Sequence, residues 1–208
     1  MSLKIGFFSL EEHMGCTRLA IHAANHIATS EYTVAVIESD QSTDPIFQTA
    51  KAEFGEDGTF FINRVHFYPA GTTTIPNEDI QIYDFGKIGI FQEFPDDFSK
   101  LYLCTSSEEE HLEDIKDYLM DTGTECELIL TGCSKEQLQL YKSNGFKCIP
   151  LADKKEKICP YNLALQLNLL LRQNEMIPPD YKKDWQFEEI QFHYNPEPEK
   201  KGLLENLF

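Results

Sequence analysis

The feature that most constrains the fold is a regular alternation of short apolar runs with helical patterns along residues 4–173. The apolar runs carry little charge, which is typical of strands buried on both faces of a parallel sheet. Strands that alternate with helices form a sheet covered by those helices. We therefore predict an α/β fold with a mostly parallel sheet flanked by helices. The predicted strands are 4–10, 33–39, 59–69, 80–86, 100–106, 126–132 and 146–151, and the predicted helices are 15–29, 45–54, 107–121, 134–145 and 160–173.

Particular residue types mark several of these boundaries. Ser107 and Ser134 are the predicted N-caps of their helices, since a serine hydroxyl can accept a hydrogen bond from a free N–H of the first turn. Asn144 and Gly145 are predicted to end the second of these helices, and Pro160 to begin the last. The run 59–69 alternates apolar with polar residues, so we predict one half-exposed strand there.

The chain divides into two parts of different composition. Its 208 residues are enough for one domain with a full core, and 41% of them are hydrophobic. Residues 1–173 carry the alternating pattern and form the predicted domain. Residues 174–208 hold four prolines and the only tryptophan, Trp185, without a long period. We predict an irregular extension whose aromatic side chains pack on the domain or on a partner.

The charge and the cysteines narrow the classes of function. The formal net charge is −17, from 35 acidic and 18 basic residues, so nucleic acid and membrane surfaces are disfavoured as partners. No apolar run is long enough to span a membrane and no signal peptide is recognisable, which predicts a cytoplasmic protein. Without a CxxC pair, a structural zinc site is not expected. The predicted free thiols are Cys16, Cys104, Cys126, Cys133, Cys148 and Cys159.

The turn after the first strand, "LEEHMGCT" at 10–17, has the place of a phosphate-binding loop. Such a loop needs glycines, a helix N-terminus, a lysine on the terminal phosphates and a Ser/Thr on magnesium, in the pattern GxxxxGK[ST]. Gly15 and Thr17 fit this pattern. Leu10 stands at the first glycine and Cys16 at the lysine. The turn therefore has the frame of a nucleotide site but lacks much of its chemistry.

The opening "KIGFFSLEEHMGCTRLAIHAANHIATSEYTVAVIESD" resembles that of the ParA/MinD-like ATPases of the deviant Walker A group. The resemblance continues through "IYDFG", at the family's Walker B segment, to about Gln173. It implies a P-loop NTPase-like fold and a role in cell organisation, pilus assembly or secretion. Asp84 and Gly86 match the Walker B segment. The family's first aspartate after the second strand is Glu38 here, and its second is Asp40.

The departures from the family lie in the loop itself. The signature lysine is Glu11, two glycines are Glu12 and His13, and the catalytic-loop lysine is Cys16. Like charges 4 Å apart repel by about 4 kcal/mol at an effective dielectric constant near 20. Loss of a lysine removes a charge-assisted hydrogen bond worth about 1.5–3 kcal/mol. Arg18 is expected on the wrong side of the turn to replace the missing lysine. We therefore expect no bound cofactor; if the loop does bind one, ATP and magnesium are the candidates.

The candidate site residues each have an ordinary alternative role. Gly15, Cys16 and Thr17 form the degenerate phosphate loop, and Thr17 with Asp84 could bind magnesium. Asp40 and Asp84 are the residual catalytic candidates. Thr17 could equally be a plain residue of a first helical turn, Asp84 a strand-end acid and Cys16 a small residue that fills the turn. His22 and His26 have a metal-ligand spacing, but no third ligand is predictable, so we interpret them as surface or interface residues.

Three functions remain open at this point. The first is a non-catalytic ParA/MinD-like module that recruits or localises a protein partner, as a homodimer or as a heterodimer with an active paralogue. The second is an active ATPase whose lysine comes from elsewhere, such as Lys87 or a dimer partner. The third is a thiol-based redox module that uses Cys16, because thiol pKa values fall at helix N-termini.

Overall fold

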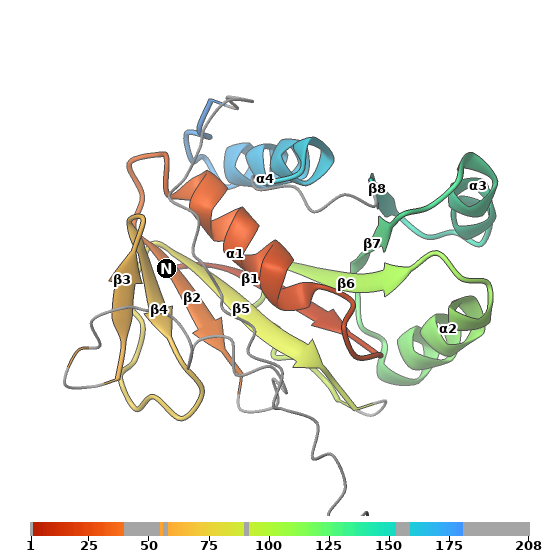
Figure 1. Cartoon of the computed structure of the whole chain (residues 1–208), viewed down its shortest axis with the longest axis horizontal. Coiled ribbons are helices and arrows are strands. Elements are labelled where there is room, and N and C mark those ends of the chain that lie inside the picture. Colours follow the sequence, from red (N-terminus) through yellow and green to blue (C-terminus); the bar gives the residue numbers. More distant parts are fainter. Residues whose placement is uncertain (1, 40–54, 56–57, 90–91, 153–158, 181–208) are drawn as a thin grey trace, which may run out of the picture.

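The computed structural model describes residues 2–39, 55, 58–89, 92–152 and 159–180. Its eight-stranded sheet has the order β3-β4-β2-β5-β1-β6-β7-β8 (Figure 1). All neighbouring strands are parallel except β3 and β4. The predicted α/β fold with a mostly parallel sheet and flanking helices is therefore confirmed. The strands are β1 Leu3–Ser9, β2 Val34–Glu38, β3 Phe60–Ile62, β4 Val65–Tyr68, β5 Ile80–Lys87, β6 Lys100–Ser106, β7 Glu127–Thr131 and β8 Cys148–Leu151.

The helices cover the two faces of the sheet in pairs. They are α1 Cys16–Ile27, α2 Glu110–Thr122, α3 Lys135–Ser143 and α4 Tyr161–Gln173. One hydrophobic layer joins the sheet to α1 and α4, which contact each other, and a second joins it to α2 and α3. Neighbouring residues of β1 point to opposite layers: Phe7 belongs to the first and Phe8 to the second. This division follows from the period-2 alternation of side chains along a strand.

The run 59–69 forms a hairpin of two short strands, so the prediction of one strand is wrong. β3 and β4 pair in antiparallel fashion around a two-residue turn at Asn63 and Arg64. Both turn residues have positive φ, 51° and 67°. Two positive φ values belong to the type I′ turn that favours hairpins, whose usual sequence mark is Asn-Gly. Arg64 stands where glycine is expected, which is why the turn was missed.

Of the two predicted serine caps, one is confirmed and one is wrong. The Ser134 side chain accepts a hydrogen bond from the Gln137 backbone N–H, and the Gln137 side chain accepts one from the Ser134 backbone N–H. This is a capping box. Ser107, by contrast, does not cap α2, which begins at Glu110 with Glu109 as its N-cap residue and no side-chain cap. Ser107 itself is buried, at the turn that leads from β6 into the helix.

Parts of the prediction fall outside the described residues. These are the expected helix 45–54, the acid Asp40 and all but the first seven residues of the 174–208 extension. Among the described helices, none has both the length and the apolar character needed to cross a bilayer.

Candidate functional site

The predicted phosphate loop lies at the point of the sheet where an α/β fold has its ligand crevice. β1 leads into α1, which returns to β2 on one side of β1, whereas the neighbouring β6 leads through α2 to β7 on the other side. The connections after β1 and β6 therefore diverge at the carboxyl ends of adjacent strands. Ligands of open α/β sheets bind at such a divergence. Residues 10–15 and 107–109 form its two walls.

The backbone of the loop is held close to the end of β5. The Ser9 hydroxyl lies 2.6 Å from the Glu11 carbonyl oxygen and 3.3 Å from that of Gly86. Gly15 precedes α1 with φ 82°, and its carbonyl accepts the first helical hydrogen bond, from Leu19. His13 also has a positive φ, 62°. A left-handed conformation at a non-glycine residue is uncommon, so the loop keeps a glycine-like backbone at a histidine.

The two loop glutamates form ion pairs with residues of neighbouring elements. Glu11 Oε1 lies 2.9 Å from His111 Nε2, and Glu12 Oε1 lies 3.5 Å from Lys87 Nζ. Lys87, which was considered as a replacement lysine, therefore does lie beside the loop. In this structure it is paired with a carboxylate of the loop itself. The Lys87 ammonium thus offsets part of the negative charge of the loop.

Arg18 lies beside Gly15, so the prediction that it lies on the wrong side of the turn to reach the loop is wrong. Its Nη2 and Nε atoms are 3.7 Å and 3.9 Å from the position that a Cβ atom would take on Gly15. Helical side chains lean toward the N-terminus of their helix, which brings a residue of the first turn back over the cap. Arg18 thus places a cation next to the loop, although not at the position of the missing lysine.

Cys16, Thr17 and Asp84 lie below the loop in the interior. Cys16 and Thr17 are buried in the first turn of α1, and Cys16 belongs to the hydrophobic layer of that face. Asp84 is fully buried on β5, where its Oδ1 accepts a hydrogen bond of 3.1 Å from the Gly86 backbone N–H. Glu38, the other acid matched to the family, is in register with Asp84 on the adjacent strand. Its Oε2 accepts a hydrogen bond from the Ala70 N–H.

The cysteines near the site, Cys16 and Cys104, are buried free thiols. Burial, together with a hydrogen bond that the Cys104 thiol donates to Cys16, raises the pKa of Cys104 well above the ordinary thiol value. At the opposite end of the sheet, burial also raises the pKa of the Cys126 thiol to about 12. A raised thiol pKa disfavours the thiolate, which is the reactive form.

Between the two walls, the described residues leave only a small cavity. The cavity there measures about 10 Å³, and its lining residues are Leu10, Glu11, Met14, Leu103, Cys104, Thr105, His111, Asp114 and Ile115. A single water needs about 10–15 Å³ on this measure, and small-molecule sites occupy about 300–1,000 Å³. The Glu11–His111 pair bridges the two walls, and the cavity that the described residues leave between these walls is too small for a nucleotide.

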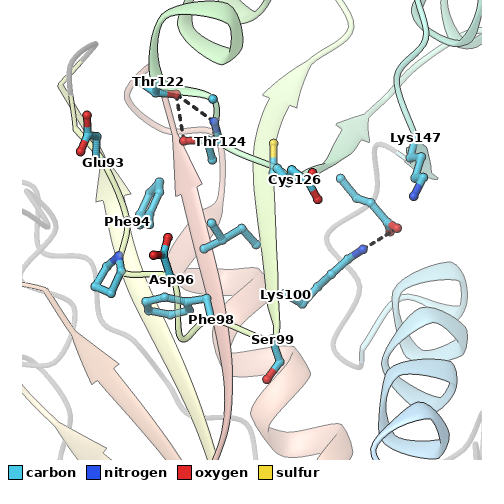
Figure 2. A pocket seen from close by; sticks show the side chains of 15 residues that line it. Glu93, Phe94, Asp96, Phe98, Ser99, Lys100, Thr122, Thr124, Cys126 and Lys147 are labelled. Atoms are coloured by element: carbon cyan, nitrogen blue, oxygen red, sulfur yellow. Dashed lines mark hydrogen bonds and ion pairs between the residues drawn. The ribbon is translucent and has the colours of Figure 1, made fainter.

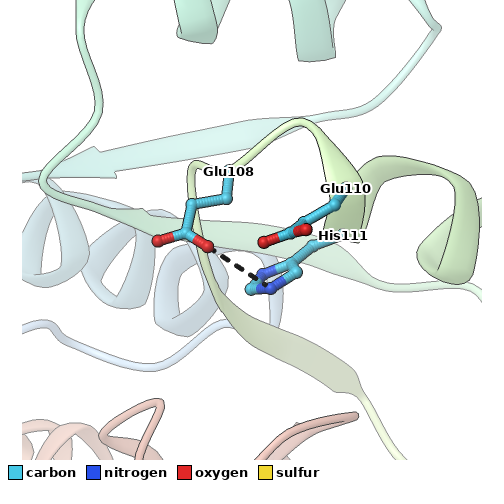
Figure 3. A group of neighbouring side chains, drawn as sticks. All are labelled: Glu108, Glu110 and His111. Carbon is cyan, nitrogen blue, oxygen red and sulfur yellow. Dashed lines mark ion pairs between the residues drawn. The ribbon is translucent and has the colours of Figure 1, made fainter.

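Sequence reasoning missed the donor set on the second wall. Donor atoms of Glu108, Glu110 and His111 lie within 4.8 Å of one another (Figure 3). The Ser106 hydroxyl lies 3.0 Å from His111 Nδ1 and orients the ring. Such oxygen and nitrogen donors could ligate a divalent cation, but Glu108 and Glu110 are exposed to solvent. The sequence around these residues is acidic, and nothing in its pattern reveals the contact of His111 with Glu11.

A larger cavity, of about 580 Å³, lies at the opposite end of the sheet. It is formed by the segment before β6, the end of α2 and the start of β7. Figure 2 shows Phe94 and Phe98 on one side and Lys100 and Lys147 on the other. The Lys100 ammonium pairs with Glu127 at 2.5 Å. The sequence does not predict this cavity either, because its walls come from three separated segments without a shared motif.

Of the two histidines of α1, His26 binds a residue of α4. His26 is buried, and its Nε2 lies 2.9 Å from Asn168 Oδ1 on α4. Burial lowers the pKa of His26, and the hydrogen bond with Asn168 opposes part of that shift. His26 is therefore a residue of the internal interface between α1 and α4 rather than of the protein surface.

Comparisons with known proteins bear on the fold. No protein-family model and no curated protein matches the sequence. Among solved structures, a plasmid partition protein from Borrelia burgdorferi bound to AMPPNP is similar at a TM-score of 0.51 and 12% identity, over 89% of this chain and 94% of that one. A ParA family ATPase from Chlorobium tepidum gives 0.56 and 12%, over 84% and 92%. A chain of the MinC:MinD cell division protein complex from Aquifex aeolicus gives 0.56 and 11%, over 87% and 99%. With its strand order and flanking helices, the chain therefore has the P-loop NTPase-like fold of the ParA and MinD ATPases.

Proposed function

We propose that this protein is a non-catalytic, cytoplasmic ParA/MinD-like module that acts through a protein partner and has lost nucleotide binding. The observation that carries the proposal is a contact between two side chains that joins the two walls of the crevice. Glu11 stands at the position of the family's signature lysine and pairs with His111 across the divergence of β1 and β6. The remaining cavity of about 10 Å³ holds at most about one water.

The charges at the loop support the same proposal. Glu11 and Glu12 bring two carboxylates to the place where a triphosphate would carry its negative charge. A bound nucleotide would have to separate Glu11 from His111 and Glu12 from Lys87. Exposed ion pairs contribute only about 0–1 kcal/mol each. The larger obstacle is therefore the repulsion between phosphate and the two carboxylates, which no lysine at position 16 offsets.

An active ATPase with an unusual loop is the second candidate. The specific observation in its favour is that two cationic side chains, Lys87 and Arg18, lie at the loop. Asp84 and Thr17 remain as candidates for magnesium and Asp84 for catalysis. In this reading, Lys87 would leave Glu12 and bind a phosphate.

A redox module based on Cys16 has less support. Cys16 and its neighbour Cys104 are both buried, and the pKa of Cys104 is raised. Redox-sensing cysteines are accessible thiols with lowered pKa values.

The proposed partner is a protein. One of the similar solved structures is a complex of two proteins, the MinC:MinD cell division protein complex. For the present chain we propose a homodimer, or a heterodimer with an active paralogue, in a cell-organisation, pilus or secretion system. The net charge of −17 disfavours bare nucleic acid and anionic membrane as partners.

Calorimetry with magnesium-ATP tests the proposal. The wild-type protein is expected to show no saturable heat at millimolar nucleotide, in the presence or absence of magnesium. Tight binding that depends on magnesium would contradict the proposal and favour the ATPase. In that case, Asp84→Asn should abolish phosphate release, and Glu93→Gln, a carboxylate change at the opposite end of the sheet, should leave it intact.

A further inference from the structure

The exposed side of α4 carries an apolar stripe that none of the described residues covers fully. Tyr161, Leu165 and Leu169 follow one another at intervals of four residues, so they lie along one face of the helix. Their exposed fractions are 59%, 44% and 43%. The helix contains no acidic residue, although the chain has 35. An uncharged apolar stripe on so acidic a protein indicates a surface that is covered by something.

The path of the chain after α4 leads back to this stripe. The Met176 N–H donates to the Leu171 carbonyl, which turns the chain around the end of the helix. The Ile177 N–H then donates to the Tyr32 hydroxyl at 2.8 Å. Finally, the Asn168 amide donates to the Pro179 carbonyl at 3.3 Å. The chain at Pro179 has therefore passed the last turn of α4 and runs back beside its middle.

Asn168 is fixed in the position that brings the chain there. Its Oδ1 lies 2.9 Å from His26 Nε2 on α1, while its Nδ2 donates to Pro179. Asn168 is adjacent to Leu169 and three residues after Leu165. On a helical surface, it therefore lies next to the stripe. The described chain thus ends beside the half of the stripe that is nearer the C-terminus of α4, and the segment from residue 181 onward continues from there.

We propose that residues 181–208 of this chain bind along the stripe of α4, with Trp185 and Phe187 on Leu165 and Tyr161. These residues lie outside the described part of the chain, and the proposal rests on where the described part ends. Leu169 and Tyr161 are about 12 Å apart along the helix axis, at about 1.5 Å per residue. Five residues of extended chain span up to about 17 Å, so Trp185 can reach the whole stripe from Asp180.

Two physical arguments favour this occupant over a second copy of the chain. A covalently attached segment is present at an effective concentration in the millimolar range, without the entropic cost of bringing two molecules together. Two copies that each carry a net charge of −17 repel each other as they approach. The segment also brings apolar side chains within a few residues of its start, including Trp185, Phe187 and Ile190.

The unique tryptophan gives a direct test in the full-length protein, because all indole fluorescence comes from Trp185. In the wild type, we expect blue-shifted emission, weak quenching by acrylamide and no change on dilution. The double variant Leu165→Glu, Leu169→Glu places charge on the stripe and is expected to shift the emission to the red and to increase quenching. The matched control is Met120→Glu on α2, since Met120 is an apolar side chain with 82% exposure. This control should behave as the wild type.

Several outcomes would overturn the proposal. One is a wild-type Trp185 that is quenched as freely as an unfolded chain, and another is an equal red shift in Met120→Glu. Protection that disappears on dilution together with a fall in molar mass would assign the stripe to a second copy. If circular dichroism shows that the double variant is unfolded, the single variant Leu165→Gln replaces it, with the same red shift expected. An unchanged spectrum in a folded Leu165→Gln protein would also overturn the proposal.

Discussion

The two ends of the sheet carry similar side chains but leave very different spaces. At the carboxyl end, where the fold places its ligand crevice, the cavity measures about 10 Å³. At the amino end, the cavity of about 580 Å³ lies within the usual range for a small-molecule site. Both ends have lysines beside glutamates. The topology therefore sets where a ligand could bind, while a few side chains decide whether there is room for it.

The side-chain pairs at the two ends differ in where they lie relative to the cavity. At the carboxyl end, the Glu11–His111 pair joins the two walls of the crevice and closes it. At the amino end, Lys100 and Glu127 lie on adjacent strands, so their pair runs along one wall and leaves the space open. A change of charge at Glu11 should therefore alter the affinity for nucleotide, whereas a change of charge at Glu127 should not.

The largest effect is expected from a rebuilt loop at the carboxyl end. The variant Glu11→Lys, Glu12→Gly, His13→Gly, Cys16→Lys removes the two carboxylates, breaks the pair with His111 and supplies two cations. Magnesium-ATP affinity, measured by calorimetry, should rise at least tenfold, or about 1.4 kcal/mol. Cys16→Lys alone should raise it less, because both carboxylates remain and position 16 is buried. A folded rebuilt protein that still ignores ATP would show that the crevice is closed by more than the loop.

A second pair of variants compares backbone strain at the two ends. Gly123, at the end of α2, has φ 66° and open space around its Cα, so Gly123→Ala should cost about 1–2 kcal/mol from the left-handed conformation alone. At His13, which has φ 62°, the reverse change should act in the opposite direction. His13→Gly should raise the free energy of unfolding by up to about 1 kcal/mol. Urea denaturation measures both, and equal signs for the two changes would contradict this account.

The pH dependence of stability is expected to depend on the amino end, where the last turn of α1 holds His26. Burial lowers the pKa of His26 in the folded chain, so the unfolded chain binds the proton more tightly. The contribution to stability is complete above the unfolded pKa of about 6.5 and is lost as the pH falls below that value toward the folded pKa. His26→Gln should flatten this part of the curve in denaturant titrations, whereas His22→Gln should not.

The smallest effects should come from the lysine–glutamate pairs. Lys87 and Glu12 are 43% and 56% exposed, against 25% and 16% for Lys100 and Glu127. Solvent screens the first pair more strongly. Double-mutant cycles should give a coupling near zero for Lys87–Glu12 and up to about 1 kcal/mol for Lys100–Glu127. A larger coupling at the carboxyl-end pair would mean that Glu12 is held by more than this contact.

The order of strands and helices could be predicted because it rests on local patterns. The buried strands are continuous apolar runs, and the capping box at Ser134 lies within four residues of sequence. The hairpin turn at 63–64 could not be recognised because Arg64 has the positive φ that is usually marked by a glycine in the sequence. The position of Arg18 was wrongly predicted because side chains in a first helical turn lean back toward the helix N-terminus, which residue order alone does not show.

The closed crevice could not be predicted, because it depends on residues that are distant in sequence. Glu11 and His111 are 100 residues apart, and only the adjacency of β1 and β6 brings them together. The loop's loss of lysine and gain of carboxylates could be found in the sequence. That a histidine would pair with one of those carboxylates required the topology. The prediction for Asp40 stays a prediction.

The ends of the strand order decide by which surfaces this protein can assemble. A sheet with an open edge can recruit a strand from another molecule, which is a route to aggregates as well as to complexes. Here one edge strand, β3, has only three residues. The other, β8, contains Pro150, which has no N–H to offer, and the Asn162 side chain already donates to the Pro150 carbonyl at 2.7 Å. In the part of the chain that the structure describes, neither edge is a good template for a further strand, so this sheet is poorly suited to pair with a strand of another molecule.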